Sequence, residues 1–465
     1  MSLSIQFLGG VRTVTGSKFL LTNNKTKILI DFGMFRGENN ITQRNYLDFE
    51  FNPSEISYLI LTHAHIDHSG LIPKLTKKGF KGKILGTKPT KDLCKIMLAD
   101  SAYVESMELE WKNRKRIRSG LPLLEPLYTI EDANKSIGFF EAVEYNKLID
   151  LKNGVRVKFL DAGHILGSSL VEIYCKNNSK ETKLVFSGDI GSRGQEIICD
   201  PAKLSYADYL FIESTYGDRL HKSRKETIKE FESTIGSAKR DKGNIIIPAF
   251  AVERTQEIVY ELSKLYRSGK LNGFTVYMDS PLAISATEIF QNNMNYFDMA
   301  TKKMLKRGDN PFSFPILKYL KSQEDSKSLN RIKSNAIIIS ASGMCDGGRI
   351  KHHLKHNLWR EECIVVFTGY QAAGTLGRAI VDGAKVVKIF GEEIAVKAKI
   401  YTLGGFSCHA DRDELLKWVS NFKNKNMEVF VIHGEEKSST SFASYVKDEL
   451  KLKTYVPSLG EKVDL

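Results

Sequence analysis

Three histidines and one aspartate lie within six consecutive residues near the start of the chain. The segment Thr62–Gly70 reads THAHIDHSG and follows a short apolar run. Imidazole nitrogens and carboxylate oxygens are good ligands for zinc and similar divalent ions. In an extended loop His63 and His65 can point at one ion, while Asp67 and His68 can turn towards a second. The spacing predicts a metal centre, and a bound divalent ion can activate water for hydrolysis.

This HxHxDH run after a strand resembles the metallo-β-lactamase superfamily, and further motifs of that superfamily occur along the chain. Asp31 ends the run KILID, His164 lies in FLDAGHILGSS and Asp189 lies in VFSGDIG. The resemblance implies that Asp31 accepts a hydrogen bond that fixes the ligand loop. It also implies that His164 binds a metal and that Asp189 bridges two metals.

The resemblance implies two metal ions, Zn²⁺ in the first place and Mn²⁺ as the alternative. The first ion is implied to be bound by His63, His65, His164 and Asp189. The second is implied to be bound by Asp67, His68, Asp189 and one further ligand. Two ions about 3.5–4 Å apart can share a hydroxide and hold a phosphodiester in line for attack. Asp67 is counted among the catalytic residues for this reason.

Three later motifs resemble the β-CASP branch of the superfamily, whose members process nucleic acids. They are Glu213 in FIESTYGDR, His409 in GGFSCHAD and His433 in VFVIHGE. The resemblance implies that His433 completes the second metal site. It implies that His409, supported by Glu213, acts as the general acid. Phosphodiester cleavage expels an alkoxide that needs a proton, and histidine titrates near neutral pH.

Three strand-to-helix turns in the middle of the chain are candidates for binding substrate phosphates. Their sequences are AFAVERTQE, SASGMCDGGR and GYQAAGTLGR. Each could be an ordinary tight turn, but backbone amides at a helix N-terminus also bind phosphate. All three resemble runs of the β-CASP insert, although Glu253 stands where many relatives have glycine. The residues assigned to substrate phosphates are Arg254, Ser342, Gly343 and Arg378.

Short apolar runs broken by turns are expected to form the strands that carry these motifs. The expected strands are Ile5–Leu8, Phe19–Thr22, Lys27–Ile30, Ser57–Leu61, Val155–Leu160, Leu170–Tyr174, Lys183–Ser187 and Tyr209–Glu213. From about Thr215, helical periodicity alternates with short apolar runs, which predicts a parallel sheet flanked by helices. The expected elements there are Thr227–Ala238, Ile245–Ile247, Arg254–Tyr266, Thr275–Met278, Ala336–Ser340 and Ile364–Thr368.

The change of pattern divides the chain into three segments and predicts an α/β fold. Residues 1–215 and 401–465 are expected to form a metallo-β-lactamase αββα sandwich, with 216–400 as an inserted α/β β-CASP domain. The first segment also contains Thr90–Ser119, which is expected to be one long helix ending in the basic run RKRIR. That run is either a solvated helix end or a contact for nucleic acid.

The composition favours an anionic partner and a reducing environment. Lysine and arginine total 68 against 55 acidic residues, which gives a formal charge of +13. Such a surplus favours phosphates, although solubility alone can also account for it. The six cysteines form no CxxC pair, so no disulfide framework is expected. With no signal pattern and no apolar span, we expect a cytoplasmic protein without a membrane partner.

Together the motifs predict a metal-dependent ribonuclease that acts in RNA processing or decay through a metal-bridging hydroxide. Single-stranded RNA is the expected partner, and a homodimer is left open. Three alternatives remain at this level: a DNA nuclease of the same branch, a metallo-hydrolase of small esters, and a binding protein that has lost catalysis. The sequence does not decide between endonuclease and exonuclease action.

Overall fold

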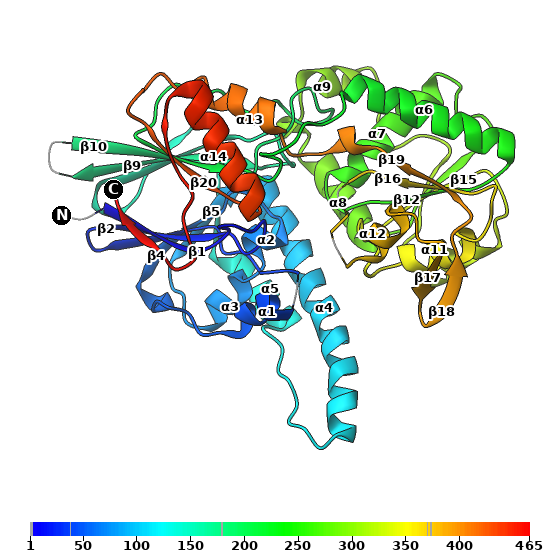
Figure 1. The fold of residues 1–465 in the computed structure, drawn as a ribbon, viewed down its shortest axis with the longest axis horizontal. Coiled ribbons are helices and arrows are strands. Elements are labelled where there is room, and N and C mark those ends of the chain that lie inside the picture. Colours follow the sequence, from blue (N-terminus) through cyan, green and yellow to red (C-terminus); the bar gives the residue numbers. More distant parts are fainter. Residues whose placement is uncertain (1–2, 38, 178–179, 370, 373) are drawn as a thin grey trace. The chain divides into compact units, whose positions relative to one another are not determined.

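The computed structural model describes residues 3–37, 39–177, 180–369, 371–372 and 374–465. The chain forms two compact units (Figure 1). The first comprises Met1–Gly194, Asp200–Leu220 and His409–Leu465, and the second comprises Gln195–Cys199 and His221–Cys408. The first unit therefore extends to Leu220 where we expected a boundary at 215, and resumes at His409 where we expected 401.

The first unit contains two mixed sheets of seven strands each. One has the order β22-β1-β2-β3-β4-β5-β6 and the other β21-β20-β11-β10-β9-β8-β7. The strands of the first sheet are β1 (Leu3–Gly9), β2 (Lys18–Asn23), β3 (Thr26–Ile30), β4 (Ile56–Ile60), β5 (Lys83–Thr87), β6 (Phe140–Val143) and β22 (Lys462–Asp464). Those of the second are β7 (Leu148–Asp150), β8 (Val155–Asp161), β9 (Ser169–Asn177), β10 (Lys180–Phe186), β11 (Tyr209–Glu213), β20 (Glu428–Ile432) and β21 (Lys453–Tyr455).

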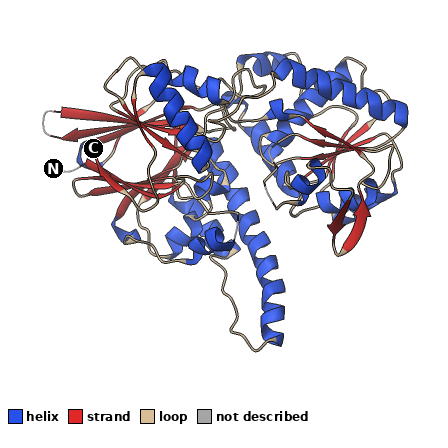
Figure 2. Ribbon diagram, in the orientation of Figure 1, coloured by secondary structure: helices blue, strands red, loops and turns tan. Residues whose placement is uncertain are grey.

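The two sheets pack face to face because each buries one apolar face against the other. The ring of Phe7 in β1 lies 5.9 Å from that of Phe430 in β20, and Phe19 in β2 lies 6.1 Å from Phe186 in β10. Helices cover the outer faces (Figure 2). They are α1 (Asn39–Thr42), α2 (Ile66–Ser69), α3 (Ile72–Lys77), α4 (Lys88–Arg118), α5 (Ile130–Ser136), α13 (Arg412–Val419) and α14 (Glu436–Leu450). The expected αββα sandwich is confirmed.

The second unit is a smaller α/β layer structure around one parallel sheet of six strands, in the order β14-β13-β15-β12-β16-β19. Its strands are β12 (Ile245–Pro248), β13 (Thr275–Met278), β14 (Leu317–Tyr319), β15 (Ala336–Ser340), β16 (Ile364–Phe367) and β19 (Lys399–Thr402), beside a hairpin of β17 (Val386–Ile389) and β18 (Glu392–Ala395). Its helices are α6 (Arg224–Asp241), α7 (Arg254–Arg267), α8 (Pro281–Asn292), α9 (Met299–Lys306), α10 (Gln323–Ser328), α11 (Ile350–Asn357) and α12 (Leu376–Val381). The expected inserted α/β domain is confirmed.

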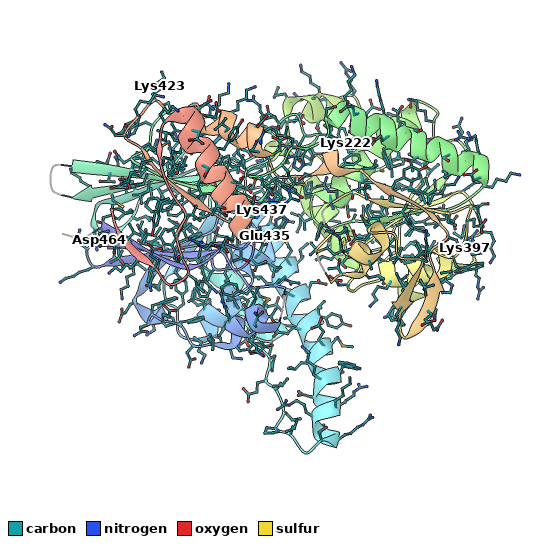
Figure 3. All side chains as sticks on the ribbon, viewed as in Figure 1. Lys222, Lys397, Lys423, Glu435, Lys437 and Asp464 are labelled. Carbon is teal, nitrogen blue, oxygen red and sulfur yellow. The ribbon has the colours of Figure 1, made fainter. Side chains whose placement is uncertain are left out.

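The side chains labelled in Figure 3, which are Lys222, Lys397, Lys423, Glu435, Lys437 and Asp464, are charged and exposed. Within the described residues, no helix combines the length and the apolar character that a membrane crossing requires. No two of the six cysteines form a disulfide in the described part of the chain.

Candidate metal centre

The HAHIDH loop begins after β4 and continues into α2, and backbone hydrogen bonds from the chain after β3 fix its path. Phe32 N donates to His68 O at 2.7 Å, and Met34 N donates to Ile66 O at 2.9 Å. Between them, Gly33 packs so closely that a Cβ atom there would lie 1.6 Å from the Asp67 carbonyl oxygen. Backbone contacts alone therefore hold the loop against the segment that follows β3.

A first group of donor atoms converges on one point in the first unit: one nitrogen each from three histidines and one carboxylate oxygen. His65 Nδ1 lies 3.1 Å from His63 Nε2 and 3.2 Å from His164 Nε2. Asp189 Oδ2 lies 3.3 Å from His63 Nε2 and 3.5 Å from His164 Nε2. These are the four residues expected to bind the first ion.

A second group lies on the other side of the same carboxylate. Asp189 Oδ1 lies 3.3 Å from His68 Nε2 and 3.5 Å from His433 Nε2. Asp67 Oδ2 lies 3.9 Å from His68 Nε2 and 3.8 Å from His433 Nε2. The structure thus brings all seven expected ligands together, and Asp189 faces each group with a different oxygen.

The spacing of the donor atoms fits coordination of divalent ions better than hydrogen bonding between the ligands themselves. Zinc–nitrogen bonds of about 2.0–2.1 Å in a tetrahedron put neighbouring donors about 3.4 Å apart. The donor–donor distances given above are 3.1–3.5 Å in the first group and 3.3–3.9 Å in the second. His68 Nε2 and Asp189 Oδ1 are buried and form no hydrogen bond with any described residue, although they lie 3.3 Å apart. Two buried acceptors turned towards a common point are expected of ligands that share a cation.

Hydrogen bonds from outside the two groups orient the ligands. Asp31 Oδ2 accepts from His68 Nδ1 at 2.7 Å and from Thr62 Oγ1 at 2.9 Å, while Oδ1 accepts from Thr62 N at 2.8 Å. With its proton on Nδ1, His68 presents the Nε2 lone pair to a metal. Ser17 Oγ lies 2.7 Å from His433 Nδ1. Thr62 and Ser17 had not been singled out, because isolated hydroxyl residues carry no sequence signal.

The electrostatics of the first group favour neutral, metal-binding imidazoles. Burial, together with the nearby His68, lowers the pKa of His63 to about 3, although Asp189 opposes the shift. Burial likewise lowers the pKa of His65 to about 4 and that of His164 well below its ordinary value. Burial alone would raise the pKa of Asp189, but the surrounding histidines hold it well below the usual range. A neutral imidazole and an ionised carboxylate are the forms that bind metal.

His409 lies beside the first donor group and is held by a buried carboxylate. Its ring centroid is 4.4 Å from that of His164, and its Nδ1 lies 3.3 Å from Glu213 Oε1. Glu213 Oε1 also accepts from Ile190 N at 2.6 Å. Burial lowers the pKa of His409, but Glu213, Asp189 and Asp67 together outweigh it and raise this pKa to about 9. His409 can therefore carry a proton at neutral pH.

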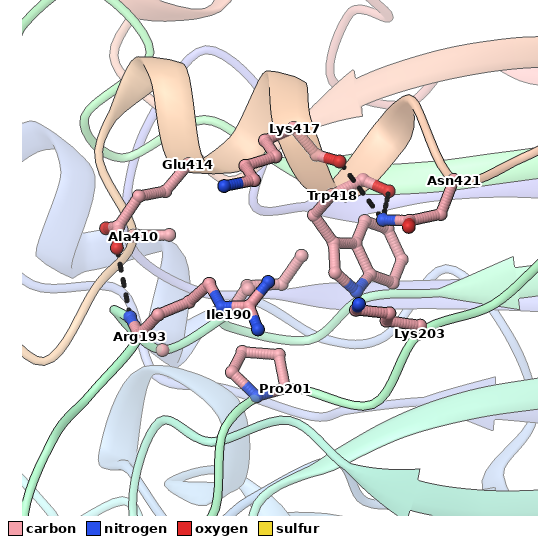
Figure 4. Close-up of a pocket in the computed structure, with 10 residues that line it drawn as sticks. Ile190, Arg193, Pro201, Lys203, Ala410, Glu414, Lys417, Trp418 and Asn421 are labelled. Carbon is pink, nitrogen blue, oxygen red and sulfur yellow. Dashed lines mark hydrogen bonds between the residues drawn. The ribbon is translucent and has the colours of Figure 1, made fainter.

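A small pocket is lined by Ala410, the residue after His409, and by Ile190 and Arg193 of the segment that follows Asp189 (Figure 4). Ser192 Oγ donates to His409 O at 2.8 Å and lies 2.9 Å from Glu414 Oε2. Glu414 Oε1 accepts from Arg193 N at 3.0 Å, as drawn in Figure 4. Ser192 and Glu414 thus tie the start of α13 to the segment that follows Asp189. Neither residue was predicted to belong to the site, since their pairing across more than two hundred residues leaves no local pattern in the sequence.

Two of the expected phosphate contacts are arginines of the second unit, and both have acidic partners. Arg254 begins α7 and is buried; its Nη1 donates to Glu257 Oε2 at 2.7 Å and its Nη2 lies 3.3 Å from Cys408 Sγ. Arg378 lies in α12, and its Nε donates to Asp382 Oδ2 at 2.8 Å.

The other two expected contacts, Ser342 and Gly343, lie in the turn between β15 and α11. Ser342 Oγ donates to Gly347 O at 3.3 Å. At Gly343 a Cβ would lie 2.9 Å from the ring of Phe250, so a larger residue would crowd the turn after β12. Arg349 Nη1 donates to buried Asp279 at 2.7 Å and fixes the end of this turn. Two residues of the third run, Tyr370 and Ala373, lie outside the described residues.

Comparisons with known proteins agree with this architecture. Three family models match: the metallo-β-lactamase superfamily over residues 12–249, the Beta-Casp domain over 255–380, and the Zn-dependent metallo-hydrolase RNA specificity domain over 393–457. "Ribonuclease TTHA0252" of Thermus thermophilus is 37% identical over 92% of each chain. "Transcription termination factor FttA" of Methanocaldococcus jannaschii is 30% identical over 98% of this chain and 70% of that one.

Among solved structures, a protein of unknown function from Enterococcus faecalis matches the whole chain over its own whole length, with a TM-score of 0.58 and 14% identity. That likeness shows a shared fold. The metallo-β-lactamase model spans six of the seven residues of the metal centre, and the RNA specificity domain model spans the seventh, His433. This chain therefore belongs to the metallo-β-lactamase superfamily, and within it to the β-CASP branch.

Proposed function

We propose that this protein is a metal-dependent ribonuclease that hydrolyses phosphodiester bonds in RNA processing or decay. The observation that carries the proposal is the pair of donor groups joined by Asp189, with a carboxylate-held histidine beside them. An ester hydrolase of small substrates needs no such proton donor next to a paired cation site. Relatives named ribonuclease and transcription termination factor support RNA as the substrate.

Two Zn²⁺ ions, with Mn²⁺ as the alternative, are the proposed cofactors. His63, His65 and His164 hold the first in this proposal, Asp67, His68 and His433 hold the second, and Asp189 contacts both. Bound ions of this kind neutralise phosphate charge and bring the pKa of coordinated water near 7. Asp31 keeps His68 in the tautomer that can bind metal, since it accepts the Nδ1 proton.

The proposed role of His409 is to hold a proton at the leaving oxygen. Glu213 orients the ring through Nδ1, which leaves Nε2 as the atom that donates to the departing alkoxide. Transfer of a proton in the transition state contributes about 10²–10⁴-fold to the rate of such reactions. Ser192 and Glu414 keep the His409 backbone in place and act as positioning residues.

Ser342, Gly343, Arg254 and Arg378 are the proposed contacts for substrate phosphates. The turn that carries Ser342 and Gly343 follows a strand and precedes α11, the arrangement that offers backbone amides to an anion. Arg254 must exchange its Glu257 partner for phosphate oxygens to take part. Arg378 must likewise leave Asp382, an exposed pair that costs little to break.

The proposal is tested by cleavage of labelled RNA by the full chain and by two variants, Asp67→Ala and His68→Ala. We expect both variants to lose cleavage while circular dichroism shows the wild-type fold. RNA labelled at the 5′ end and at the 3′ end, with and without chelator, separates endonuclease from exonuclease action. Undiminished cleavage by either variant would defeat the assignment.

Matched RNA and DNA strands in the same assay decide between the two nucleic acids. Cleavage of DNA alone would replace the proposal with a DNA nuclease of the same branch. Hydrolysis of small esters without cleavage of either strand would point to the small-ester hydrolase. Metal-loaded protein that cleaves none of these substrates would point to a binding protein that has lost catalysis.

A further inference from the structure

Helix α4 and the chain that returns along it form an arm, defined here as residues 103–124. Figure 1 shows the C-terminal half of α4 running beyond the other helices of the first unit. Asn113 Nδ2 donates to Leu124 O at 3.0 Å and Arg116 Nε donates to Pro122 O at 2.5 Å, so the returning chain is bound to the helix. The arm is therefore an ordered element that has little core of its own.

One face of the arm exposes large apolar side chains at helical spacing. Tyr103, Met107 and Trp111 follow one another at four-residue steps and are 53%, 50% and 58% exposed. Residues four apart lie above one another on a helix. The three side chains therefore form a stripe open to solvent along α4, where an ordinary surface helix would place polar residues.

The arm becomes strongly basic towards its tip, and Arg114, Lys115 and Arg118 lie on the side of the stripe. Residues 111–121 contain five cationic side chains and no acidic one: Lys112, Arg114, Lys115, Arg116 and Arg118. Their one ion pair among the described residues joins Arg114 to Glu110 at 3.5 Å, and both groups are mostly exposed. The ammonium of Lys115 lies 3.6 Å from the centre of the Trp111 ring. Glu105, Glu108 and Glu110 offset three of the five positive charges along the arm, so residues 103–124 carry a net charge of +2, with the excess at the tip beside Trp111.

We propose that this arm binds a single-stranded segment of RNA outside the metal centre. The inference rests on the proposed function, because it extends the RNA contact of the same enzyme. Exposed aromatic rings stack on bases of any sequence, and lysine and arginine bind the phosphates between them. A second copy of the chain is disfavoured as the occupant, since each copy carries a formal charge of +13 and the patch would face another positive surface.

The N-terminus of α4 connects the arm to the metal centre. Thr87 Oγ1 and Thr90 Oγ1 donate to Gly167 O at 2.7 Å and 2.9 Å, and Gly167 lies three residues after His164. From Lys88 to Arg114 the helix rises about 39 Å at 1.5 Å per residue. At about 3.4 Å per nucleotide of stacked strand, an RNA needs about 11 nucleotides to reach from the centre to the tip. The arm is therefore a contact for long substrates.

The first test removes charge from the arm and compares RNA binding with a matched control. The arm variant is Arg114→Gln/Lys115→Gln/Arg118→Gln. The control, Lys423→Gln/Lys425→Gln/Lys447→Gln, removes the same charge from exposed lysines of the same unit, one of which is labelled in Figure 3. Both are made in an Asp67→Asn background, so that binding is measured without cleavage. Fluorescence anisotropy follows a single strand of about 30 nucleotides and one of about 6.

For the long strand, we expect the arm variant to raise Kd at least about tenfold and to lower the salt slope by about 2, at about 0.7 per lost phosphate contact. The control should leave both quantities near the parent values, and the short strand should not distinguish the three proteins. Equal Kd values for the arm variant and the control on the long strand would overturn the proposal. Cleavage of the short strand by wild-type protein, which needs no arm, reports separately on the proposed function.

The second test addresses the aromatic stripe. Trp111→Ala should weaken binding of the long strand about tenfold, while Trp111→Phe retains most of it, because every aromatic ring can stack on a base. Trp111 is exposed, so both variants should keep the wild-type melting temperature. Light scattering measures the mass of each protein in parallel. A change from dimer to monomer in Trp111→Ala, with RNA binding unaltered, would identify the stripe as a dimer interface and refute the proposal.

Discussion

The proton on His409 depends most on one buried carboxylate, that of Glu213, and this dependence can be measured. Burial lowers the pKa of His409, but Glu213, with smaller contributions from Asp189 and Asp67, raises it to about 9. A general acid works only while protonated, so activity should fall as pH rises through this pKa, and bound metal ions lower the midpoint. In Glu213→Gln the raising charge is lost. We expect the alkaline limb of the kcat–pH profile to move to lower pH and kcat to fall.

The matched control for this prediction is Glu172→Gln, a buried carboxylate of the same unit that pairs with Lys183 and Lys158 instead of with a histidine of the centre. It should leave the profile in place. An alkaline limb at the same pH in Glu213→Gln and in wild type would show that His409 is not the group that titrates.

Asp31 gives a second prediction at the scale of single residues. Its carboxylate accepts from both His68 and Thr62, and loss of such a partner typically costs 10–100-fold in metal affinity. We expect Asp31→Asn to weaken metal binding by about that factor, measured by competition with a chromogenic chelator. The centre should still form, because the seven proposed ligands are intact. Wild-type metal affinity in Asp31→Asn would show that Asp31 does not support the metal centre.

The residues of the centre were predictable to the extent that they lie in compact motifs. HAHIDH follows a strand, and once it suggested the family, Asp31, His164, Asp189 and His433 could be sought one by one. Ser17, Ser192 and Glu414 could not, because each acts through a contact with a residue far away in sequence. A hydroxyl or a carboxylate without a local partner carries no pattern until the fold has placed it.

At the scale of elements, the loop of His164 depends on a close backbone approach. A Cβ atom at Gly191 would lie 1.5 Å from the carbonyl oxygen of Gly163, so one of the two segments must move. We expect Gly191→Ala to cost more than about 2 kcal/mol of unfolding free energy and to weaken metal binding. Gly138→Ala, where a Cβ meets open space, is the control and should have little effect. Chemical denaturation of both variants provides the comparison.

The predicted elements were most accurate where an uninterrupted run of apolar or β-branched residues forms the whole strand or a long helical pattern forms the helix. The observed β11, β13 and β15 have the predicted bounds, and α4 was found to within two residues at its start and one at its end. The strands β5 and β6 and the hairpin β17–β18 were missed. They are short, and β6, β17 and β18 each contain a charged residue and leave two of four residues exposed, so no continuous apolar run marks them.

The course of the chain through both units was predictable, but the boundary residues were not. The alternation of helices and strands indicated an inserted α/β unit, whereas β19 (Lys399–Thr402) was not assigned to it. The strand β19 pairs with β16 at the edge of the parallel sheet. No local sequence pattern predicts this pairing. The segment Gln195–Cys199 likewise lies with the second unit although its neighbours belong to the first.

For the whole molecule, removal of metal should destabilise one unit selectively. All the proposed ligands belong to the first unit. A ligand present at about 100–1,000 times its Kd stabilises the folded form by about 3–4 kcal/mol. We expect a chelator to lower the melting temperature of the transition that belongs to the first unit, followed by calorimetry, and to leave that of the second unit in place. Equal shifts of both transitions would contradict this expectation.

Anomalous X-ray diffraction from crystals of the full chain grown with zinc tests the metal centre most directly. Data collected above and below the zinc absorption edge locate each bound ion without reference to activity. We predict two anomalous peaks about 3.5–4 Å apart, one on each side of the Asp189 carboxylate. The absence of any peak among these seven side chains, with zinc present in the crystal, would contradict the account.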